Sequence, residues 1–326
     1  MPSALPQMAM LLVLFAALRW MPGWAFVVLG VLPLLAYGVW ANRTRAHSLN
    51  GAFVVVTGAS SGLGRALAHE AARRGASKVA LLARRAERLD QVAAEIAGFA
   101  PTCTPIVVPC DLSDAESTAA AAAALERHHG SPDIVVNNAG AGAWEHIEET
   151  GPDSARQMME VPTLAAIRLT HALVPAMAER GSGHVLTVTS AASMSALRGA
   201  VVYGTARWGM RGLAWNLRAD LAEQGVGVTL LNAAEITDTE YFHDGDGRAG
   251  QASHSRLPML FQHPLMESVS YSSAQTASAA WNAVEAGTFE ALVPGFVLMP
   301  FDLLNRLFPD VVVALLALGP NGRRGF

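Results

Sequence analysis

The first candidate binding motif is a stretch of mostly small residues, Thr57-Gly58-Ala59-Ser60-Ser61-Gly62-Leu63-Gly64. It joins a predicted strand to a predicted helix. Small side chains let the backbone approach a pyrophosphate closely, and the amides and dipole at a helix amino terminus attract the anion. A glycine-rich turn at the start of a βαβ unit therefore predicts a dinucleotide site. The expected cofactor contacts here are Gly58, Ser60, Ser61, Gly62, Leu63 and Gly64.

The sequence also indicates which dinucleotide is preferred. The position about 20 residues after such a turn contacts the adenosine ribose, and an acidic residue there favours NAD. Here the position holds Arg84, followed by Arg85. Because an arginine pairs with a 2′-phosphate, these residues favour NADP (NADPH). The alternative is that both arginines are solvated residues at a helix start.

Four further segments carry a family pattern: Cys110-Asp111-Leu112, Asn137-Asn138-Ala139-Gly140, Ser190, and Tyr203-Gly204-Thr205-Ala206-Arg207. Together with the glycine turn they resemble the short-chain dehydrogenase/reductase family, over roughly Gly51 to Pro294. The resemblance implies that Asp111 contacts the adenine ring. It also implies that the Asn-Asn-Ala-Gly segment stabilises the central strand beside the cofactor. The cofactor contacts expected on this basis are Asp111, Leu112, Asn138, Ala139, Gly140, Tyr203, Arg207, Ile236 and Thr237.

The same resemblance implies that Ser190 holds the substrate oxygen and that Tyr203 protonates it. The chemistry requires these types, because hydride arriving at a carbonyl carbon builds negative charge on oxygen. A tyrosine with an ordinary pKa near 10 needs a nearby cation to act near neutrality. The residue four positions later lies on the same helix face, and here it is Arg207. We therefore expect Ser190, Tyr203 and Arg207 to be the catalytic residues.

Three positions depart from the family pattern. Arg207 stands where the family has lysine, and the chain holds a single lysine, Lys78. Arginine keeps the charge, but it is larger and planar. Pro162 replaces an asparagine whose backbone carbonyl helps to hold a relay water. Since proline removes an N–H, we expect a helix kink that frees the carbonyl of Met158. Ala233-Ala234 replaces a Pro-Gly pair, with Thr237 or Thr239 left to meet the cofactor.

The elements that must position these residues alternate between short apolar runs and helical patterns. This rhythm predicts an α/β fold, a Rossmann-type doubly wound parallel sheet of about seven strands with helices on both faces. The expected strands are 52–57, 78–82, 104–109, 133–137, 184–189, 226–231 and 289–293.

The amino end predicts membrane attachment. Met8 to Leu18 is too short to span a bilayer, whereas Trp24 to Ala41 is long enough and is followed by Arg43 and Arg45. Arginines at that position place the following domain in the cytosol. A single span and a helical hairpin both fit the pattern, and a removed targeting segment is a further alternative.

Two later segments interrupt the α/β rhythm. Residues 237–274 form an expected substrate loop, with the polar stretch Asp244 to Ser255 and an apolar lid, Leu257 to Phe261. The apolar tail Gly295 to Gly319 is interrupted by Pro300 and Pro309, so we expect an interfacial or substrate-covering segment. The predicted domains are an anchor and linker (1–48), an NADP-binding domain (49–294) and an apolar extension (295–326).

Composition excludes several classes of protein. The chain is 52% hydrophobic and 15% charged with a net charge of −4, so neither a disordered chain nor a nucleic-acid-binding surface is expected. Cys103 and Cys110 lack disulfide or metal spacing, and the ten histidines form no ligand cluster, so no metal site is expected.

These features together predict a membrane-anchored, NADP-dependent oxidoreductase with its domain facing the cytosol. Its expected substrate is a lipophilic carbonyl or secondary alcohol, and its expected partners are membrane lipid and a second copy of the chain. The alternative is an NADP-binding family member with impaired catalysis, acting as a sensor or membrane scaffold.

Overall fold

The computed structural model describes residues 32, 36, 42–140, 142–241 and 269–316. The chain divides into two units, Met1–Arg43 and Thr44–Phe326. Most of the predicted anchor, including Trp24 to Ala41 apart from Leu32 and Ala36, lies outside the described residues, as do Asp244 to Ser255 and the predicted lid. Among the described residues, one helical stretch, Pro152–Glu179, is long and apolar enough to cross a membrane, and half of it is buried within the domain.

The second unit is built on a seven-stranded parallel sheet in the order β3-β2-β1-β4-β5-β6-β7. This confirms the predicted fold class. The strands are β1 (Phe53–Thr57), β2 (Lys78–Ala83), β3 (Thr104–Pro109), β4 (Ile134–Asn137), β5 (Gly183–Ser190), β6 (Val226–Ala233) and β7 (Glu290–Val293). Each lies within two residues of the range predicted from its apolar run.

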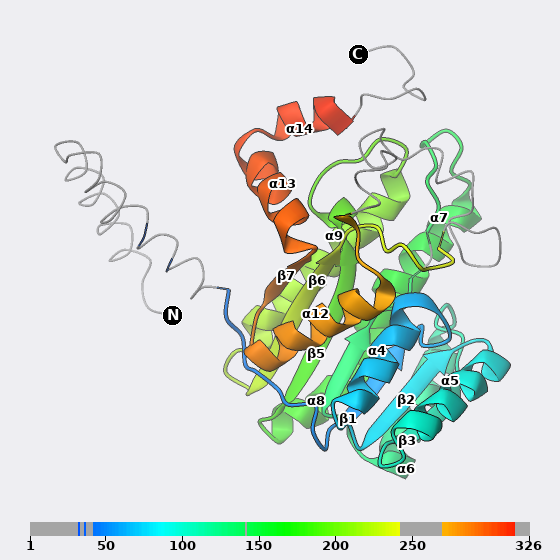
Figure 1. Ribbon diagram of the computed structural model, residues 1–326. Helices are drawn as coiled ribbons and strands as arrows, with labels where there is room; N and C mark the ends of the chain where they lie inside the picture. The colour runs from blue at the N-terminus through cyan, green and yellow to red at the C-terminus, as the bar shows by residue number, and fades with distance from the viewer. Residues whose placement is uncertain (1–31, 33–35, 37–41, 141, 242–268, 317–326) are drawn as a thin grey trace. The chain divides into compact units, whose positions relative to one another are not determined.

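Helices cover both faces of the sheet (Figure 1). One layer contains α4 (Gly62–Arg73), α5 (Ala86–Phe99) and α12 (Ser273–Ala286). The other contains α6 (Ala115–His129), α8 (Ala165–Glu179) and α9 (Val201–Leu221). Shorter elements are α7 (Pro152–Met159), the π-helix η2 (Glu160–Leu164) and the 3₁₀-helix η3 (Ala191–Ser193).

The strands are buried on both faces because successive side chains point to opposite sides. Val54 and Val56 pack in the core cluster beneath α4, α5 and α12. Val55 lies between them in sequence and packs in the opposite cluster, beneath α6, α8 and α9. This explains why the strands read as nearly continuous apolar runs.

The linker Thr44 to Asn50 is fixed to the amino-terminal ends of the last two strands. The amide of Thr44 donates to the carbonyl of Gly287 (2.9 Å), and its hydroxyl accepts from the amide of Val228 (2.9 Å). The amide of His47 donates to the carbonyl of Val284 (3.2 Å). The domain therefore begins at the edge of the sheet formed by β6 and β7.

The apolar tail forms two helices, α13 (Gly295–Leu307) and α14 (Pro309–Leu316), which follow β7. Pro300 lies inside α13 and does not end it, contrary to the interruption expected from the sequence. Pro309 does mark a boundary, because it is the first residue of α14, a position where its missing N–H is not needed. Cys103 and Cys110 are both free and buried, as expected.

Candidate active site

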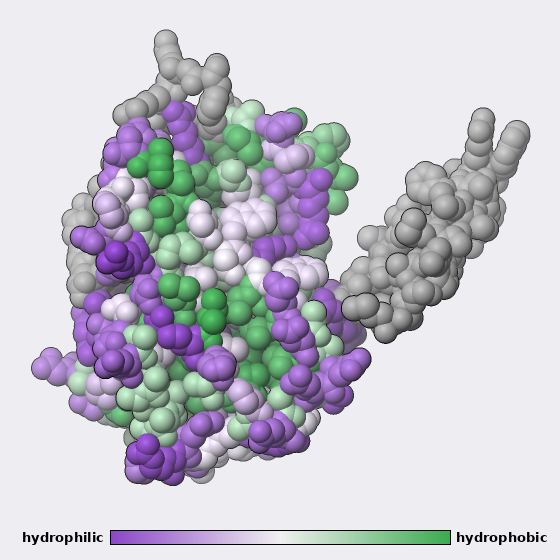
Figure 2. Space-filling model, turned by 180° about the vertical axis from the view of Figure 1, so that it is seen from behind, coloured by the Kyte–Doolittle hydropathy of each residue, from purple (hydrophilic) through white to green (hydrophobic). Residues whose placement is uncertain are grey.

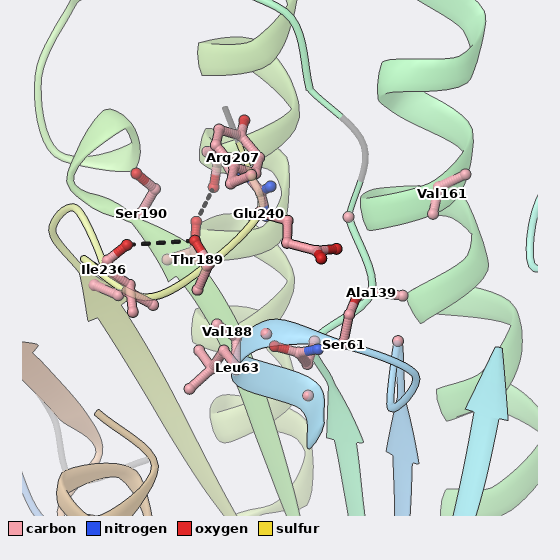
Figure 3. A pocket seen from close by; sticks show the side chains of 18 of the residues that line it. Ser61, Leu63, Ala139, Val161, Val188, Thr189, Ser190, Arg207, Ile236 and Glu240 are labelled. Atoms are coloured by element: carbon pink, nitrogen blue, oxygen red, sulfur yellow. Dashed lines mark hydrogen bonds between the residues drawn. The ribbon is translucent and has the colours of Figure 1, made fainter. Parts of the chain in front are cut away.

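The carboxyl ends of the central strands surround a cavity of about 370 Å³. Its walls come from the turn after β1, the ends of β2 and β5, the segments after β3, β4 and β6, and helix α9. Figure 3 shows Ser61 and Leu63 on the first turn, Ala139 after β4, and Ser190 and Arg207 on β5 and α9. This is the edge at which parallel α/β sheets bind their ligands.

The first turn has the properties of an anion site. A Cβ atom on Gly64 would lie 2.2 Å from the carbonyl oxygen of Gly58, so only glycine permits this close approach. Helix α4 begins here with no capping hydrogen bond from the side chain of Ser61 and no acidic residue in its first turn. The first amides of α4 are therefore not capped by the residue that precedes them, and the helix dipole favours an anion there.

Polar contacts hold this turn against the segment after β4. The hydroxyl of Thr57 donates to the carbonyl of Val136 (2.9 Å) and accepts from the amides of Asn138 (2.9 Å) and Ala139 (3.0 Å). The Nδ2 atom of Asn138 donates to the carbonyl of Thr57 (2.9 Å). These bonds fix the spacing between the two loops that form the floor of the cavity.

Two arginines and one aspartate line the outer part of the cavity. Nη2 of Arg85 donates to the hydroxyls of Ser60 (3.0 Å) and Ser61 (3.3 Å). Burial raises the pKa of Asp111, but hydrogen bonds from Ser113 and the charge of Arg84 outweigh it, so this pKa lies below its ordinary value. Asp111 is therefore a carboxylate at neutral pH, with a cation close by.

The predicted catalytic residues come together on the inner wall. Tyr203 and Arg207 lie one turn apart on α9, and the guanidinium carbon of Arg207 lies 4.9 Å from the centre of the Tyr203 ring. Both residues are buried, at 6% and 7% exposure. Ser190 ends β5, and its hydroxyl accepts a bond from the amide of Ala192 (3.3 Å).

The surroundings of Tyr203 make its proton easier to lose. Burial alone would raise its pKa, but the positive charge of Arg207 acts in the opposite direction. Hydrogen bonds from Ser190, Tyr241 and Arg207 also favour the phenolate, and the pKa of Tyr203 lies below its ordinary value. Burial opposes the charge of Arg207, but its contacts with Tyr203 and Tyr241 raise the pKa of the guanidinium, which stays charged.

Arg207 fits the site because its neighbours are small or fixed. A Cβ atom on Gly140 would lie 2.7 Å from Nη2 of Arg207, so a side chain at position 140 would displace the guanidinium. The backbone is held as well, since the hydroxyl of Thr189 donates to the carbonyl of Arg207 (3.1 Å; Figure 3). The hydroxyl of Thr163 donates to the carbonyl of Ala206 (3.1 Å) and ties η2 to α9.

Pro162 lies within the π-helix η2, where the amide of Ala165 bonds to the carbonyl of Glu160 instead of that of Val161. The helix is thus not regular at the position where a kink was expected. Pro162 has no N–H to offer the carbonyl of Met158. A second cavity, of about 10 Å³, lies beside Val161 and Pro162 and is close to the size that one water molecule needs.

Several lining residues were not predicted from the sequence. Tyr241 extends from the segment after β6, with its ring 6.3 Å from that of Tyr203. Trp144 also lies beside Tyr203, and the centres of their rings are 5.9 Å apart. Leu197 and Glu240 also line the cavity. These residues lie outside the family motifs, so no local signal in the sequence marked them.

One predicted contact does not reach the cavity. All the other predicted cofactor-binding and catalytic residues line it, but Thr237 does not. The amide of Thr237 bonds to the carbonyl of Tyr271 (3.2 Å) instead. Thr239, the alternative named above, lines the cavity together with Ala233, Ala234 and Ile236.

Comparisons with known proteins match the domain that carries this site. A family model described as short chain dehydrogenase matches residues 52–246. Dehydrogenase/reductase SDR family member 7B of Mus musculus is 35% identical over 196 residues, which cover 60% of each chain. Dehydrogenase/reductase SDR family protein 7-like of Anopheles gambiae is 34% identical over 198 residues, which cover 60% of this chain and 62% of the relative. The 3-dehydrosphinganine reductase of Danio rerio is 34% identical over 200 residues, or 60% of this chain and 59% of the relative.

The matches thus span about three fifths of the length of these relatives. Among solved structures, a short-chain dehydrogenase from Streptomyces avermitilis is 29% identical with a TM-score of 0.67, and the match covers 82% of this chain and 96% of that one. A metagenomic short-chain oxidoreductase in complex with NADP is 26% identical with a TM-score of 0.60, covering 76% and 97%.

Proposed function

The chain belongs to the short-chain dehydrogenase family, and on that premise we propose that it is an NADP-dependent oxidoreductase acting on a carbonyl or secondary alcohol. The observation that carries the proposal is the cluster at the inner wall. A buried tyrosine with a lowered pKa, a buried cation and a serine hydroxyl meet there at one cavity. This is the set of groups that hydride transfer to a carbonyl requires.

The residues present fit a phosphorylated dinucleotide. The uncapped start of α4 and the close approach of Gly64 to Gly58 suit a pyrophosphate. Arg84 and Arg85 line the cavity, and their positive charges suit a ribose 2′-phosphate. One of the similar solved structures is in complex with NADP. When bound, NADPH supplies the hydride, and the protein supplies the proton and the groups that orient the substrate.

The protein's own part is to orient and protonate. In the reductive direction, Ser190 donates a hydrogen bond to the carbonyl oxygen, and Tyr203 transfers its proton to that oxygen as the carbon is reduced. The charge of Arg207 stabilises the phenolate left on Tyr203. In the oxidative direction the same phenolate accepts the alcohol proton. We infer that Tyr241 assists by donating a hydrogen bond to the Tyr203 oxygen.

We further propose a lipophilic substrate and membrane attachment. The cluster around Tyr203 is apolar and includes Trp144, Met158 and Leu197. Residues 24–41 are the proposed anchor, with Arg43 and Arg45 favouring a domain in the cytosol. Trp208 and Trp215 are exposed on α9 and support pairing with a second copy. The face that carries α6, α8 and α9 shows hydrophobic areas among polar ones (Figure 2).

A substrate panel tests the proposal. Full-length protein in detergent is given ketones and secondary alcohols of increasing alkyl length with each of the four nicotinamide cofactors, and nicotinamide absorbance is followed. We expect turnover with NADPH or NADP, increasing with chain length. NADPH binding without turnover of any substrate would instead support the sensor or scaffold alternative.

A further inference from the structure

A series of linked polar side chains lies behind the wall of the cavity that carries Ser190. Ser193, Asn232, Glu290 and Arg211 are linked in that order, and they belong to η3, β6, β7 and α9. Ser193 and Asn232 are fully buried, and the side chains of Glu290 and Arg211 are 11% and 12% exposed. Within the described part of the chain, none of these four residues lines the cavity. Since burying an ion pair and an amide costs desolvation free energy, packing alone does not account for them.

The first residue of this network determines where the hydroxyl of Ser190 points. The hydroxyl of Ser193 donates to the carbonyl of Ser190 (2.8 Å) and to Oδ1 of Asn232 (2.8 Å). The amide of Ala192, also in η3, donates to the hydroxyl oxygen of Ser190 (3.3 Å). That contact uses the oxygen as an acceptor, so the single hydrogen of the hydroxyl is left to donate. Helix η3 therefore holds Ser190 as a donor to the oxygen of Tyr203.

Glu290 determines which way the amide of Asn232 faces. A carboxylate can only accept hydrogen bonds, so it selects Nδ2 of Asn232, which donates to Oε1 of Glu290 (2.9 Å). The amide oxygen of Asn232 is thereby directed to the hydroxyl of Ser193. The reverse orientation of the amide would leave two acceptors facing each other. The carboxylate on β7 thus acts on η3 through the amide on β6.

Arg211 connects the network to the helix that carries the proton donor. Its Nη1 lies 2.7 Å from Oε1 of Glu290. Tyr203, Arg207 and Arg211 follow one another at intervals of four residues on α9, so they lie on the same side of that helix. One end of the network therefore lies next to Ser190 and the other end lies on the helix of Tyr203. These two hydroxyls must face a single substrate oxygen, so their relative position matters for the reaction.

We propose that Ser193, Asn232 and Glu290 are positioning residues, which act through η3 to direct the hydroxyl of Ser190 relative to that of Tyr203. The inference rests on the oxidoreductase function proposed above, and it adds residues that do not touch the cavity. A misplacement of about 1 Å caused by a change outside the reacting groups can cost up to about 100-fold in rate. The network therefore contributes to catalysis without contacting the substrate.

The first test is Ser193→Ala, which removes one hydroxyl and leaves the backbone in place. Ser195→Ala is the matched control, because Ser195 is also buried (3% exposed) and its hydroxyl has no hydrogen-bond partner among the described residues. Ser195 does not line the cavity. Ser193→Ala should lower kcat for a ketone roughly 3- to 10-fold, the range that one hydrogen bond supplies. KM for the ketone and NADPH binding should stay nearly unchanged, and Ser195→Ala should match the wild type.

The pKa of Tyr203 is a second readout, and it does not need turnover. A hydroxyl of Ser190 that points elsewhere no longer stabilises the phenolate, so this pKa should rise. Ultraviolet absorbance titration measures it after subtraction of the same protein carrying Tyr203→Phe. Ser193→Ala should raise the pKa by roughly half a unit to one unit, and Ser195→Ala should leave it unchanged. A purely structural role of Ser193 would lower thermal stability without moving this pKa.

An exchange of the amide and the carboxylate tests the contribution of Asn232 and Glu290. Asn232→Asp places a second carboxylate beside Glu290, so it should lower kcat more than Ser193→Ala does. Adding Glu290→Gln to this variant restores a donor and an acceptor at the two positions, because the glutamine amide can donate to the aspartate. The double variant should therefore recover part of the lost kcat and bring the pKa of Tyr203 back toward that of the wild type.

Several results would contradict the inference. It is overturned if Ser193→Ala matches Ser195→Ala in kcat and in the pKa of Tyr203. A lower kcat with an unchanged pKa also overturns it, because Ser193 would then have a structural role only. A double variant no better than Asn232→Asp would overturn the roles of Asn232 and Glu290. If the wild type turns over no substrate, the proposed function fails, while the titration of Tyr203 still decides whether the network directs Ser190.

Discussion

Arg207 is the residue on which the chemistry depends most, because it replaces the lysine expected from the family resemblance. The glycine at position 140 makes room for the larger guanidinium, and the contact with the ring of Tyr203 keeps the charge beside the phenol. The replacement therefore preserves the electrostatic effect, even though an arginine is not equivalent to a lysine in shape.

Tyr241 should tune the pH dependence. Its hydroxyl contributes to the lowered pKa of Tyr203, and on the inferred bond to the Tyr203 oxygen Tyr241→Phe removes that contribution. That pKa then rises toward its ordinary value. Alcohol oxidation needs the phenolate and increases as pH rises through this pKa, so its pH profile should move to higher pH. Ketone reduction needs the phenol, so its decline at high pH should also move upward.

The control for this prediction is Tyr271→Phe, which removes a hydroxyl outside the cavity. Both variants are followed by kcat/KM against pH in both directions. A profile for Tyr241→Phe that coincides with that of the wild type would mean that the hydroxyl of Tyr241 has no part in tuning Tyr203.

Arg85 should determine cofactor preference together with Arg84. Arg85→Gln removes a charge-assisted bond worth about 1.5–3 kcal/mol, so KM for NADPH should rise roughly 10- to 100-fold while KM for NADH stays the same. Arg65→Gln is the matched control, because Arg65 pairs with Glu95 away from the cavity (2.6 Å). Equal changes for both cofactors would show that Arg85 does not contact the 2′-phosphate.

At the scale of elements, the strands and the first turn were predictable because their signals are local. The apolar runs predicted all seven strands, and the turn Thr57 to Gly64 predicted the start of α4. The position of Tyr241 was not predictable, because it depends on how the segment after β6 returns over α9. The π-helix was predictable only in part: Pro162 indicated an irregularity but not its type.

A polar network behind the site is a second feature without a local signal. The hydroxyl of Ser193 donates to Oδ1 of Asn232 (2.8 Å), and Nδ2 of Asn232 donates to Oε1 of Glu290 (2.9 Å). Glu290 also pairs with Arg211 (2.7 Å). The network connects η3, β6, β7 and α9, so it holds the segment after Ser190 in place.

His184 links the stability of the sheet to pH. It is fully buried on β5, and its Nε2 lies 2.9 Å from the hydroxyl of Thr229. Burial, helped by the charge of His47, lowers the pKa of His184 to about 3. In the unfolded chain its pKa is near 6.5, so the unfolded state binds a proton that the folded state does not. The stability contributed by neutral His184 is present above pH 6.5 and is lost as pH falls.

The expected loss is about 1.4 kcal/mol per pH unit below pH 6.5. Urea unfolding between pH 7 and pH 5 measures it. His184→Gln should be less stable at pH 7 but should flatten this slope, whereas His171→Gln, at an exposed position, should leave it unchanged. A slope that is the same in the His184 variant would assign the pH dependence to other groups.

At the scale of the whole molecule, the low charge fraction has more than one source. The first 50 residues contain three charged residues, all arginines, whereas the sheet is apolar because its strands are covered on both sides. The sequence therefore predicted both an apolar end and a doubly covered sheet. It left open whether the apolar tail covers the substrate or turns its apolar side outward, because that depends on which side of α13 packs on the domain.

The central claim is that this molecule is an enzyme whose proton donor is Tyr203. The most direct test compares full-length wild type, Tyr203→Phe and the control Tyr271→Phe with NADPH and the best ketone of the panel. General acid catalysis typically contributes 10²–10⁴-fold, so Tyr203→Phe should lower kcat by about 100-fold or more, with NADPH binding unchanged by fluorescence titration. Turnover that persists at the wild-type rate in Tyr203→Phe would contradict the account.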